Sequence, residues 1–285
     1  MRFLRFSQNG RLGLAVAHNG AFHGLFAGDA GYPGDLPDLL NGGLEGLKTA
    51  GAALAKGPEI DETTIAYLPP LPNPGKIICL GLNYKDHAAE GGFEVPAFPT
   101  VFARFASGLI GHEAPILRPK VSDALDFEGE MVAVMGKKAR HVAKADALGH
   151  VIGYSIFNDG SVRDYQMKTP QWTVGKNFDD TGAFGPYFVT ADELPPGASG
   201  LKIETRLNGE VVQHATTADM VFDVETTIAL LSTAFALLPG DILVMGTPSG
   251  IGAARKPPLW MKPGDVCEIE IERIGVLRNK IVQEV

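Results

Sequence analysis

The sequence predicts an α+β protein in which strands outnumber helices, and three observations support this. Short segments rich in valine and isoleucine, such as residues 76–81, 151–158 and 266–274, recur along the second part of the chain. The clearest helix there is residues 224–238. Strands and helices do not alternate regularly, which argues against a doubly wound parallel sheet.

The first 25 residues alternate loosely between apolar and polar side chains. Turn signals at Asn9-Gly10 and Asn19-Gly20 divide them, which predicts a small β-meander. Residues 36–56 follow with leucines at helical spacing, and Gly42-Gly43 can split this helix in two. We expect the meander and helix to form a small α/β region.

Four prolines fall within residues 68–75, a composition that cannot form a helix and disfavours a central strand. We therefore place a domain boundary here. The prediction is a small N-terminal domain of residues 1–70 and a catalytic domain of residues 71–285.

The second part opens with a short buried strand, and Asp223 is a candidate N-cap for the helix that Pro239-Gly240 ends. The elements expected here are strands at 76–81, 151–158, 241–246 and 266–274, and helices at 143–148 and 224–238.

Composition limits the classes of function. The chain has 285 residues, 45% of them hydrophobic, and a net charge of −8 without a basic run, which argues against nucleic-acid binding. No segment is apolar and long enough to span a bilayer, and the start lacks the apolar core of a signal peptide. Cys79 and Cys267 suggest neither a zinc site nor a disulfide framework. A cytoplasmic protein without membrane partners is expected.

Residues 126–136 combine acidic residues with a buried strand. Side chains alternate along a strand, so Asp126, Glu128 and Glu130 would share one face about 7 Å apart. A hard divalent cation would relieve their mutual repulsion, and Mg2+, Mn2+ and Ca2+ all prefer such oxygen ligands. A solvated acidic edge strand is the competing interpretation.

Three further features could carry chemistry. Asp159 follows the strand 151–158, where either a ligand or an ordinary turn residue is expected. His87 and Glu90 are spaced so that a carboxylate could orient an imidazole base, beside Gly91-Gly92, although a solvated helix has the same pattern. Lys176 follows an apolar run and could stabilise negative charge if buried.

The glycine-rich segment 246–252 follows the strand 241–246. Its backbone N–H groups and hydroxyls could bind an anion, or it could be a wide turn. Neither a P-loop nor a dinucleotide-binding fingerprint is present, and the GxSxG and HExxH motifs are missing too.

Taken in order, six segments resemble the fumarylacetoacetate hydrolase superfamily. They are GLNYKDHAAE, DFEGEMVAVMGK, YSIFNDGSVRDYQ, WTVGKNFDDTGAFGP, RLNGE and LVMGTPSGIG, within residues 76 to about 275. The resemblance implies a mixed β-sandwich or β-roll with short helices, assembled as a homodimer or a dimer-based oligomer.

The resemblance also implies roles for individual residues. It implies metal ligands at Glu128, Glu130 and Asp159, with Mg2+ as the cation and Mn2+ or Ca2+ as substitutes. The catalytic residues implied are His87 and Glu90, on a lid, and Lys176. The substrate-binding residues implied are Arg163, Gln166, Thr247 and, at a position where many relatives have lysine, Arg104. An arginine and a lysine are not interchangeable at a tight site, so the role of Arg104 is the least transferable.

These roles suggest metal-dependent hydrolysis of a 2,4-diketo acid to pyruvate and a carboxylic acid. In this mechanism His87 activates water, Lys176 faces the oxyanion and the metal stabilises the pyruvate enolate. An acylpyruvate or a 2,4-diketo-3-deoxy sugar acid is the expected substrate. The same metal site could instead support decarboxylation of an oxaloacetate-like acid, tautomerisation, or dehydration or isomerisation of a 2-keto-3-deoxy acid. A protein that only binds a small acid is the alternative without catalysis.

Overall fold

The computed structural model describes residues 1–86 and 97–285. The chain begins with a meander of three antiparallel strands, β1 (Arg2–Gln8), β2 (Arg11–His18) and β3 (Ala21–Phe26). Both connecting turns, Asn9-Gly10 and Asn19-Gly20, have positive φ at their two central residues. This backbone matches the twist of tight hairpins, and it confirms the predicted meander.

The predicted N-terminal helix is split, as the glycine pair suggested. Helix α1 (Leu36–Leu39) and a 3₁₀ turn (Leu40–Gly42) precede helix α2 (Gly43–Leu54). Gly43 has a φ of 62°, so the chain changes direction there without a side-chain clash.

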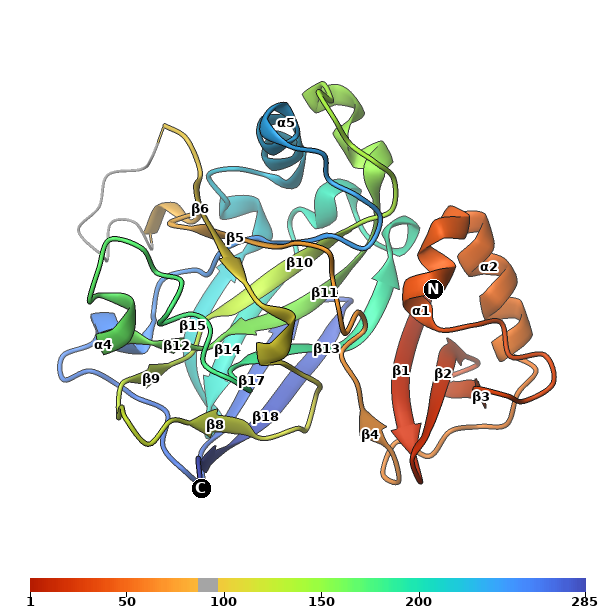
Figure 1. The fold of residues 1–285 in the computed structure, drawn as a ribbon, viewed down its shortest axis with the longest axis horizontal. Coiled ribbons are helices and arrows are strands. Elements are labelled where there is room, and N and C mark those ends of the chain that lie inside the picture. Colours follow the sequence, from red (N-terminus) through yellow and green to blue (C-terminus); the bar gives the residue numbers. More distant parts are fainter. Residues whose placement is uncertain (87–96) are drawn as a thin grey trace.

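Within the described residues, the main sheet has eleven strands and is mostly antiparallel (Figure 1). Its strand order is β3-β2-β1-β13-β11-β10-β16-β5-β6, with β4 beside β1 and β7 beside β13. The bounds of the strands not yet given are β4 Ala66–Tyr67, β5 Ile77–Gly81, β6 Thr100–Arg104, β7 Leu109–Ile110, β10 Gly129–Met135, β11 Val151–Asp159, β13 Gly182–Thr190 and β16 Ile242–Val244.

The N-terminal meander continues this sheet. Strand β1 pairs with β13 through Arg2 and Phe3, which lie opposite Val189 and Phe188. One hydrophobic cluster accordingly joins buried side chains of both parts of the chain, among them Phe3, Leu47, Val132, Phe157 and Phe188. The proline-rich residues 68–76 cross between the two parts without helix or strand.

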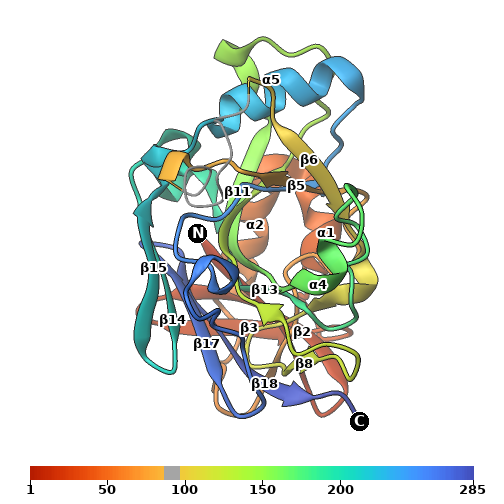
Figure 2. The same cartoon turned by 90° about the vertical axis from the view of Figure 1, so that its left-hand side faces the viewer.

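A second, five-stranded sheet packs against the main one, and the views of Figures 1 and 2 show it beside β10, β11 and β13. Its order is β15-β14-β17-β18-β8, from β8 Ile116–Arg118, β14 Lys202–Leu207, β15 Glu210–Thr216, β17 Val266–Ile271 and β18 Gly275–Gln283. The largest hydrophobic cluster lies between the sheets, with Met131 and Ile156 from one and Ile203, Ile269 and Leu277 from the other. The fold is therefore the predicted strand-rich sandwich.

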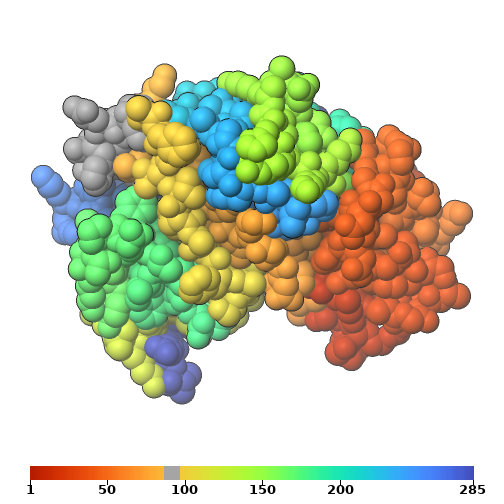
Figure 3. All heavy atoms as spheres, turned by 45° about the horizontal axis from the view of Figure 1, so that its top comes forward, coloured from red at the N-terminus to blue at the C-terminus, as the bar shows by residue number. Residues whose placement is uncertain are grey.

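Helix α5 (Val224–Ala234) lies beside the 3₁₀ segment Lys144–His150 on the surface seen in Figure 3. Asp223 caps it as predicted, because its carboxylate accepts a hydrogen bond from the N–H of Thr226. The helix ends four residues before the expected Leu238. Leu237 instead exchanges two backbone hydrogen bonds with Ala139, a tertiary pairing that periodicity cannot show.

Candidate metal centre and cavity

Strands β10 and β11 bring three carboxylates together at one edge of their pairing. Gly129 lies opposite Asn158, and the N–H of Asp159 donates to the carbonyl of Glu128 at 2.9 Å. The start of one strand therefore meets the end of the other. Glu128, Glu130 and Asp159 are all buried, and each offers an oxygen within 4.8 Å of the others. These are the three ligands that the family resemblance implied.

Asp126 does not join this group, although strict alternation predicted one face for it, Glu128 and Glu130. The chain is not one strand here, because Leu125–Asp126 form a separate strand, β9, paired with β12 (Ser161–Val162), and β10 begins only at Gly129. Asp126 turns to the other side, where it accepts hydrogen bonds from the N–H groups of Gly252 and Ala253 at 2.8 and 2.9 Å.

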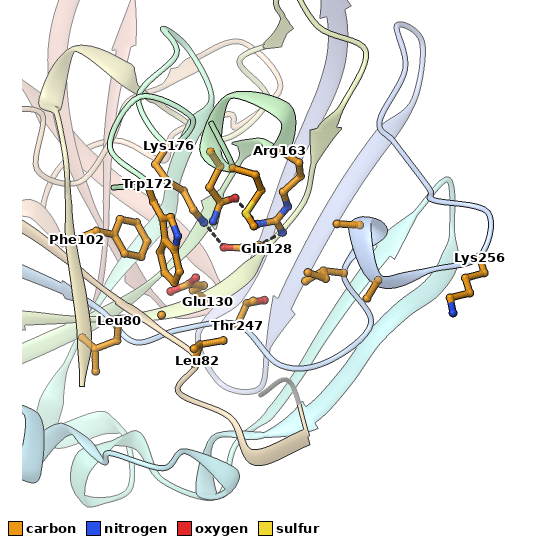
Figure 4. Close-up of a pocket in the computed structure, with 16 residues that line it drawn as sticks. Leu80, Leu82, Phe102, Glu128, Glu130, Arg163, Trp172, Lys176, Thr247 and Lys256 are labelled. Carbon is orange, nitrogen blue, oxygen red and sulfur yellow. Dashed lines mark hydrogen bonds and ion pairs between the residues drawn. The ribbon is translucent and has the colours of Figure 1, made fainter. Parts of the chain in front are cut away.

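Two cationic side chains contact the carboxylates from the cavity side (Figure 4). The Nζ of Lys176 lies 2.6 Å from Glu128 Oε2 and 2.7 Å from Asp159 Oδ2. The guanidinium of Arg163 binds Asp126 at 2.8 Å and Glu128 Oε1 at 2.6 Å, and it donates to Gln166 Oε1. Burial alone would lower the pKa of Lys176, but Asp159 and Glu128 outweigh it and raise the pKa, so the lysine is charged.

Arg104 contacts Asp159 from the side opposite the cavity. Its side chain is fully buried and lies 2.5 Å from Asp159 Oδ1, 3.0 Å from the carbonyl oxygen of Gly160 and 2.9 Å from the hydroxyl of Thr181. Arg104 does not line the cavity in front of the carboxylates. The structure thus places this predicted substrate-binding residue against a metal-ligand candidate, on the side away from the cavity.

The glycine-rich loop after β16 binds the protein's own carboxylates. The N–H of Gly246 donates to Glu130 Oε2 at 2.6 Å. Burial, with the neighbouring charges of Asp159 and Glu128, raises the pKa of Glu130 well above its ordinary value. Either a proton or a metal cation would neutralise this carboxylate, which is the situation expected of a cation site.

A buried glutamine that the sequence did not single out organises the other side of the site. Gln213 on β15 accepts hydrogen bonds from the N–H of Gly129 at 3.0 Å and the hydroxyl of Thr205 at 2.7 Å. Its amide donates to the hydroxyl of Thr247 and the carbonyl of Pro248, both at 2.8 Å. Thr247, predicted to bind substrate, is therefore held by the second sheet.

A cavity of about 490 Å³ opens in front of the cluster. Its polar lining includes Glu128, Glu130, Arg163 and Lys176, together with the predicted substrate-binding residues Gln166 and Thr247. Figure 4 shows Phe102, Trp172 and Leu80 on one side of it, next to Lys176 and Glu130. The rest of the described lining is Gly81, Leu82, Met167, Ile251, Ala253, Ala254 and Lys256.

The donor set fits a hard divalent cation. Three monoanionic oxygen ligands on two adjacent strands are the chemistry that Mg2+ or Mn2+ prefers. Among the described residues, the three carboxylates and the neighbouring Asp126 lie with the cations Arg104, Arg163 and Lys176, and these seven groups together carry one negative charge when all are ionised. A dication would reverse that sign and make the cavity attractive to an anionic substrate.

The predicted base His87 and its partner Glu90 lie outside the described residues, so their roles remain predictions. Among the described residues, three participants were missed: Gln213, Phe102 and Trp172. Gln213 lies in a strand with no local signal of its role. Trp172 stands four residues before Lys176, and the turn between them closes with a hydrogen bond from the N–H of Lys176 to the carbonyl of Trp172.

Comparison with known proteins finds relatives that match the part of the chain that carries this site. Residues 76–282 match the family model described as fumarylacetoacetate (FAA) hydrolase C-terminal. A mitochondrial oxaloacetate tautomerase of Xenopus laevis is 40% identical over 289 residues, which cover 99% of this chain and 90% of the relative.

Two solved structures with the same fold also resemble this chain along its whole length. A fumarylacetoacetate hydrolase from Exiguobacterium antarcticum has a TM-score of 0.87 at 33% identity, with full coverage of both chains. A maleylpyruvate hydrolase from a Sphingobium species has a TM-score of 0.81 at 29% identity, again with full coverage of both.

Proposed function

The chain belongs to the fumarylacetoacetate hydrolase family, and from this premise we propose that it is a metal-dependent tautomerase of oxaloacetate. The observation that carries the proposal is the buried carboxylate cluster of Glu128, Glu130 and Asp159 facing a cavity lined by Lys176 and Arg163. Relatives of this family include tautomerases and hydrolases, and the relative at 40% identity over nearly the whole chain is an oxaloacetate tautomerase.

Charge balance favours an anionic substrate once a cation is bound. A bound dication would change the balance of these groups from one negative to one positive charge, which attracts a 2-oxo acid, and the choice of oxaloacetate among such acids follows the name of the Xenopus relative. Glu128, Glu130 and Asp159 would hold the cation, which would supply Lewis-acid stabilisation for the enolate form of a 2-oxo acid.

The side chains have separate tasks in this proposal. Lys176 and Arg163 orient Glu128 through ion-pair contacts of 2.6 Å each. Thr247 lines the cavity, and its hydroxyl accepts a hydrogen bond from Gln213 and donates one to the carbonyl of Gly129 at 3.0 Å, so it would have to leave that carbonyl to donate to the substrate. His87, with Glu90, would move the proton between C3 and the 2-oxo oxygen, a task for a base near neutrality.

Hydrolysis of a 2,4-diketo acid is the second candidate. The likeness to a maleylpyruvate hydrolase and a fumarylacetoacetate hydrolase favours it. It needs the same enolate-stabilising site plus an activated water, and His87 is the proposed activator. Decarboxylation of oxaloacetate needs the enolate alone.

One experiment separates the three reactions. Enol oxaloacetate, dissolved in an aprotic solvent and diluted into buffer, loses its ultraviolet absorbance as it becomes the keto form. We expect this loss to be fast with protein and Mg2+, slow with a chelator, and not accompanied by pyruvate. Pyruvate released from oxaloacetate would indicate a decarboxylase, and faster release from acylpyruvates would indicate the hydrolase.

The metal site is tested by Glu128→Gln, with Glu113→Gln as the matched control, because the side chain of Glu113 is 45% exposed and its partners among the described residues, His112 and Arg278, lie outside the site. Calorimetry should show Mg2+ binding in wild type and in Glu113→Gln, and little in Glu128→Gln. Tautomerisation should fall at least about a hundredfold in Glu128→Gln alone. Unchanged Mg2+ binding in Glu128→Gln would refute the ligand assignment.

Assembly and location remain proposals as well. We propose a homodimer, which light scattering at micromolar concentration would test against a monomer. Among the described residues, no helix is long and apolar enough to cross a membrane. The predicted cytoplasmic location contrasts with the mitochondrial name of the Xenopus relative, and fractionation of cells would decide between them.

A further inference from the structure

One side of the cavity is an aromatic wall that the chemistry of oxaloacetate does not use. Phe102 on β6 and Trp172 meet edge to face, with ring centroids 5.6 Å apart and an interplanar angle of 68°. Met167 also lines the cavity, with 69% of its surface exposed. Figure 4 shows Phe102 and Trp172 on the same side of Glu130.

The backbone makes room for this wall. Trp172 lies over Gly81, where an added Cβ would come within 2.3 Å of the indole ring. A glycine at the end of β5 therefore lets the indole approach the strand closely. Both rings are only partly buried, so apolar surface remains exposed to the cavity. Such surface gains free energy when an apolar group covers it.

The wall adjoins the charged cluster. The Nζ of Lys176 lies 5.0 Å from the centroid of Phe102, while the same ammonium contacts Glu128 and Asp159. A 2-oxo acid held at the carboxylate cluster would thus have its far end next to aromatic rings. A cavity of about 490 Å³ is also far larger than a four-carbon acid needs, since pockets of this size hold drug-sized ligands.

We propose that Phe102 and Trp172 form a subsite for an apolar, preferably aromatic, substituent on C3 of the substrate. The substrate class then includes 3-aryl-2-oxo acids such as phenylpyruvate, and the further activity is their keto–enol interconversion. The C3–H bond breaks, a C2–C3 double bond forms, and the 2-oxo oxygen gains a proton, with no net change in composition. This inference rests on the proposed function for the reaction, but the subsite itself rests on the geometry.

Binding is measured directly, so that the result does not depend on turnover. Calorimetry with Mg2+-loaded protein gives Kd for oxalate, pyruvate, 2-oxobutanoate, 2-oxopentanoate and phenylpyruvate. We expect Kd to fall up to about fourfold for each methylene added to the tail, and at least about tenfold from pyruvate to phenylpyruvate.

Two variants and a control locate the effect. Trp172→Ala should remove most of the preference for phenylpyruvate, while Kd for oxalate, which has no tail, stays within about twofold. Gly81→Ala keeps the indole but displaces it, and should reduce the same preference. Val174→Ala is the matched control, because Val174 is two residues from Trp172, 63% exposed and not part of the cavity lining, and it should behave as wild type.

Equal Kd values for pyruvate and phenylpyruvate would overturn the subsite, as would a tail preference that survives in both Trp172→Ala and Gly81→Ala. Tight binding of phenylpyruvate without its tautomerisation, in protein that tautomerises oxaloacetate, would overturn the further activity. Failure of the proposed function looks different, because oxaloacetate tautomerisation would then be absent whether or not the tail preference is found.

Discussion

Replacing Arg104 with methionine should destabilise the protein, even without substrate, because it removes an ion-pair partner of the buried carboxylate of Asp159. The guanidinium is fully buried and joins Asp159, the carbonyl of Gly160 and the hydroxyl of Thr181. Methionine keeps much of the apolar volume and supplies none of these donors. Asp159 would keep its contact with Lys176 at 2.7 Å, but its Oδ1 would be left buried without its ion-pair partner.

The size of the effect follows from these contacts. Removing one partner of a buried ion pair costs about 3–5 kcal/mol, and the contact that Asp159 retains with Lys176 places this case near 3 kcal/mol. The entropy of unfolding is about 2 cal/mol/K per residue, so over a chain of 285 residues this loss corresponds to a Tm lowered by about 5 °C. Arg104→Lys keeps the charge but not the planar guanidinium, so its Tm should lie between those of wild type and Arg104→Met.

Differential scanning calorimetry of the chelator-treated protein is the appropriate assay, because a bound cation would partly replace the missing charge. Arg278→Met provides the control. Arg278 is 41% exposed and pairs with Glu113, which is also exposed, so its loss should cost under about 1 kcal/mol. If Arg104→Met melted within 1–2 °C of Arg278→Met, the buried ion pair would contribute no more than a surface pair, and the positioning of Asp159 by Arg104 would be refuted.

Two further predictions test the supports of the site. Gln213→Leu should lower the free energy of unfolding by about 3 kcal/mol and weaken Mg2+ binding, because it leaves the N–H of Gly129 without its acceptor between the two proposed ligands Glu128 and Glu130. Thermal melting and calorimetry measure the two effects. The control Gln8→Leu, which removes an exposed hydrogen bond to Thr64, should change neither quantity. Burial lowers the pKa of His112, whose Nδ1 accepts a hydrogen bond from the N–H of Arg278, so its neutral form is favoured on folding. The contribution of neutral His112 to the free energy of unfolding is then complete above a pH of about 6.5 and is lost as the pH falls below that value. The Tm of His112→Gln should therefore drop less between pH 7 and 5 than the Tm of wild type. An identical drop in both proteins would exclude His112 as a cause.

Local chemistry made part of the site predictable. Glu128 and Glu130 are two residues apart at a strand, so alternation alone placed them on one face. The same rule failed for Asp126, because the strand breaks before Gly129 and Asp126 pairs with a different segment. A break of this kind depends on the partner strand and leaves no trace in the local pattern.

The tertiary contacts of the site were not predictable from spacing. Lys176 is buried, and the turn that carries it packs so closely that a Cβ at Gly175 would lie 2.2 Å from the backbone of Gln166. Gln213 comes from an ordinary hairpin of the second sheet and acts across the sandwich. For the fold, turn chemistry predicted the meander and the helix break at Gly43, whereas the early end of α5 is set by the distant Ala139.

The pairing of β1 with β13 has a consequence for how this protein tolerates change. Strand β13 carries Phe188 and Val189, and without the meander their backbone groups would lie open along a sheet edge. Such an edge recruits strands from other molecules. We therefore expect the N-terminal meander to keep this edge of the sheet from pairing with strands of other molecules. Substitutions there should be judged first by whether they keep that edge covered, and a shortened chain would be more prone to aggregate even with every cavity residue in place.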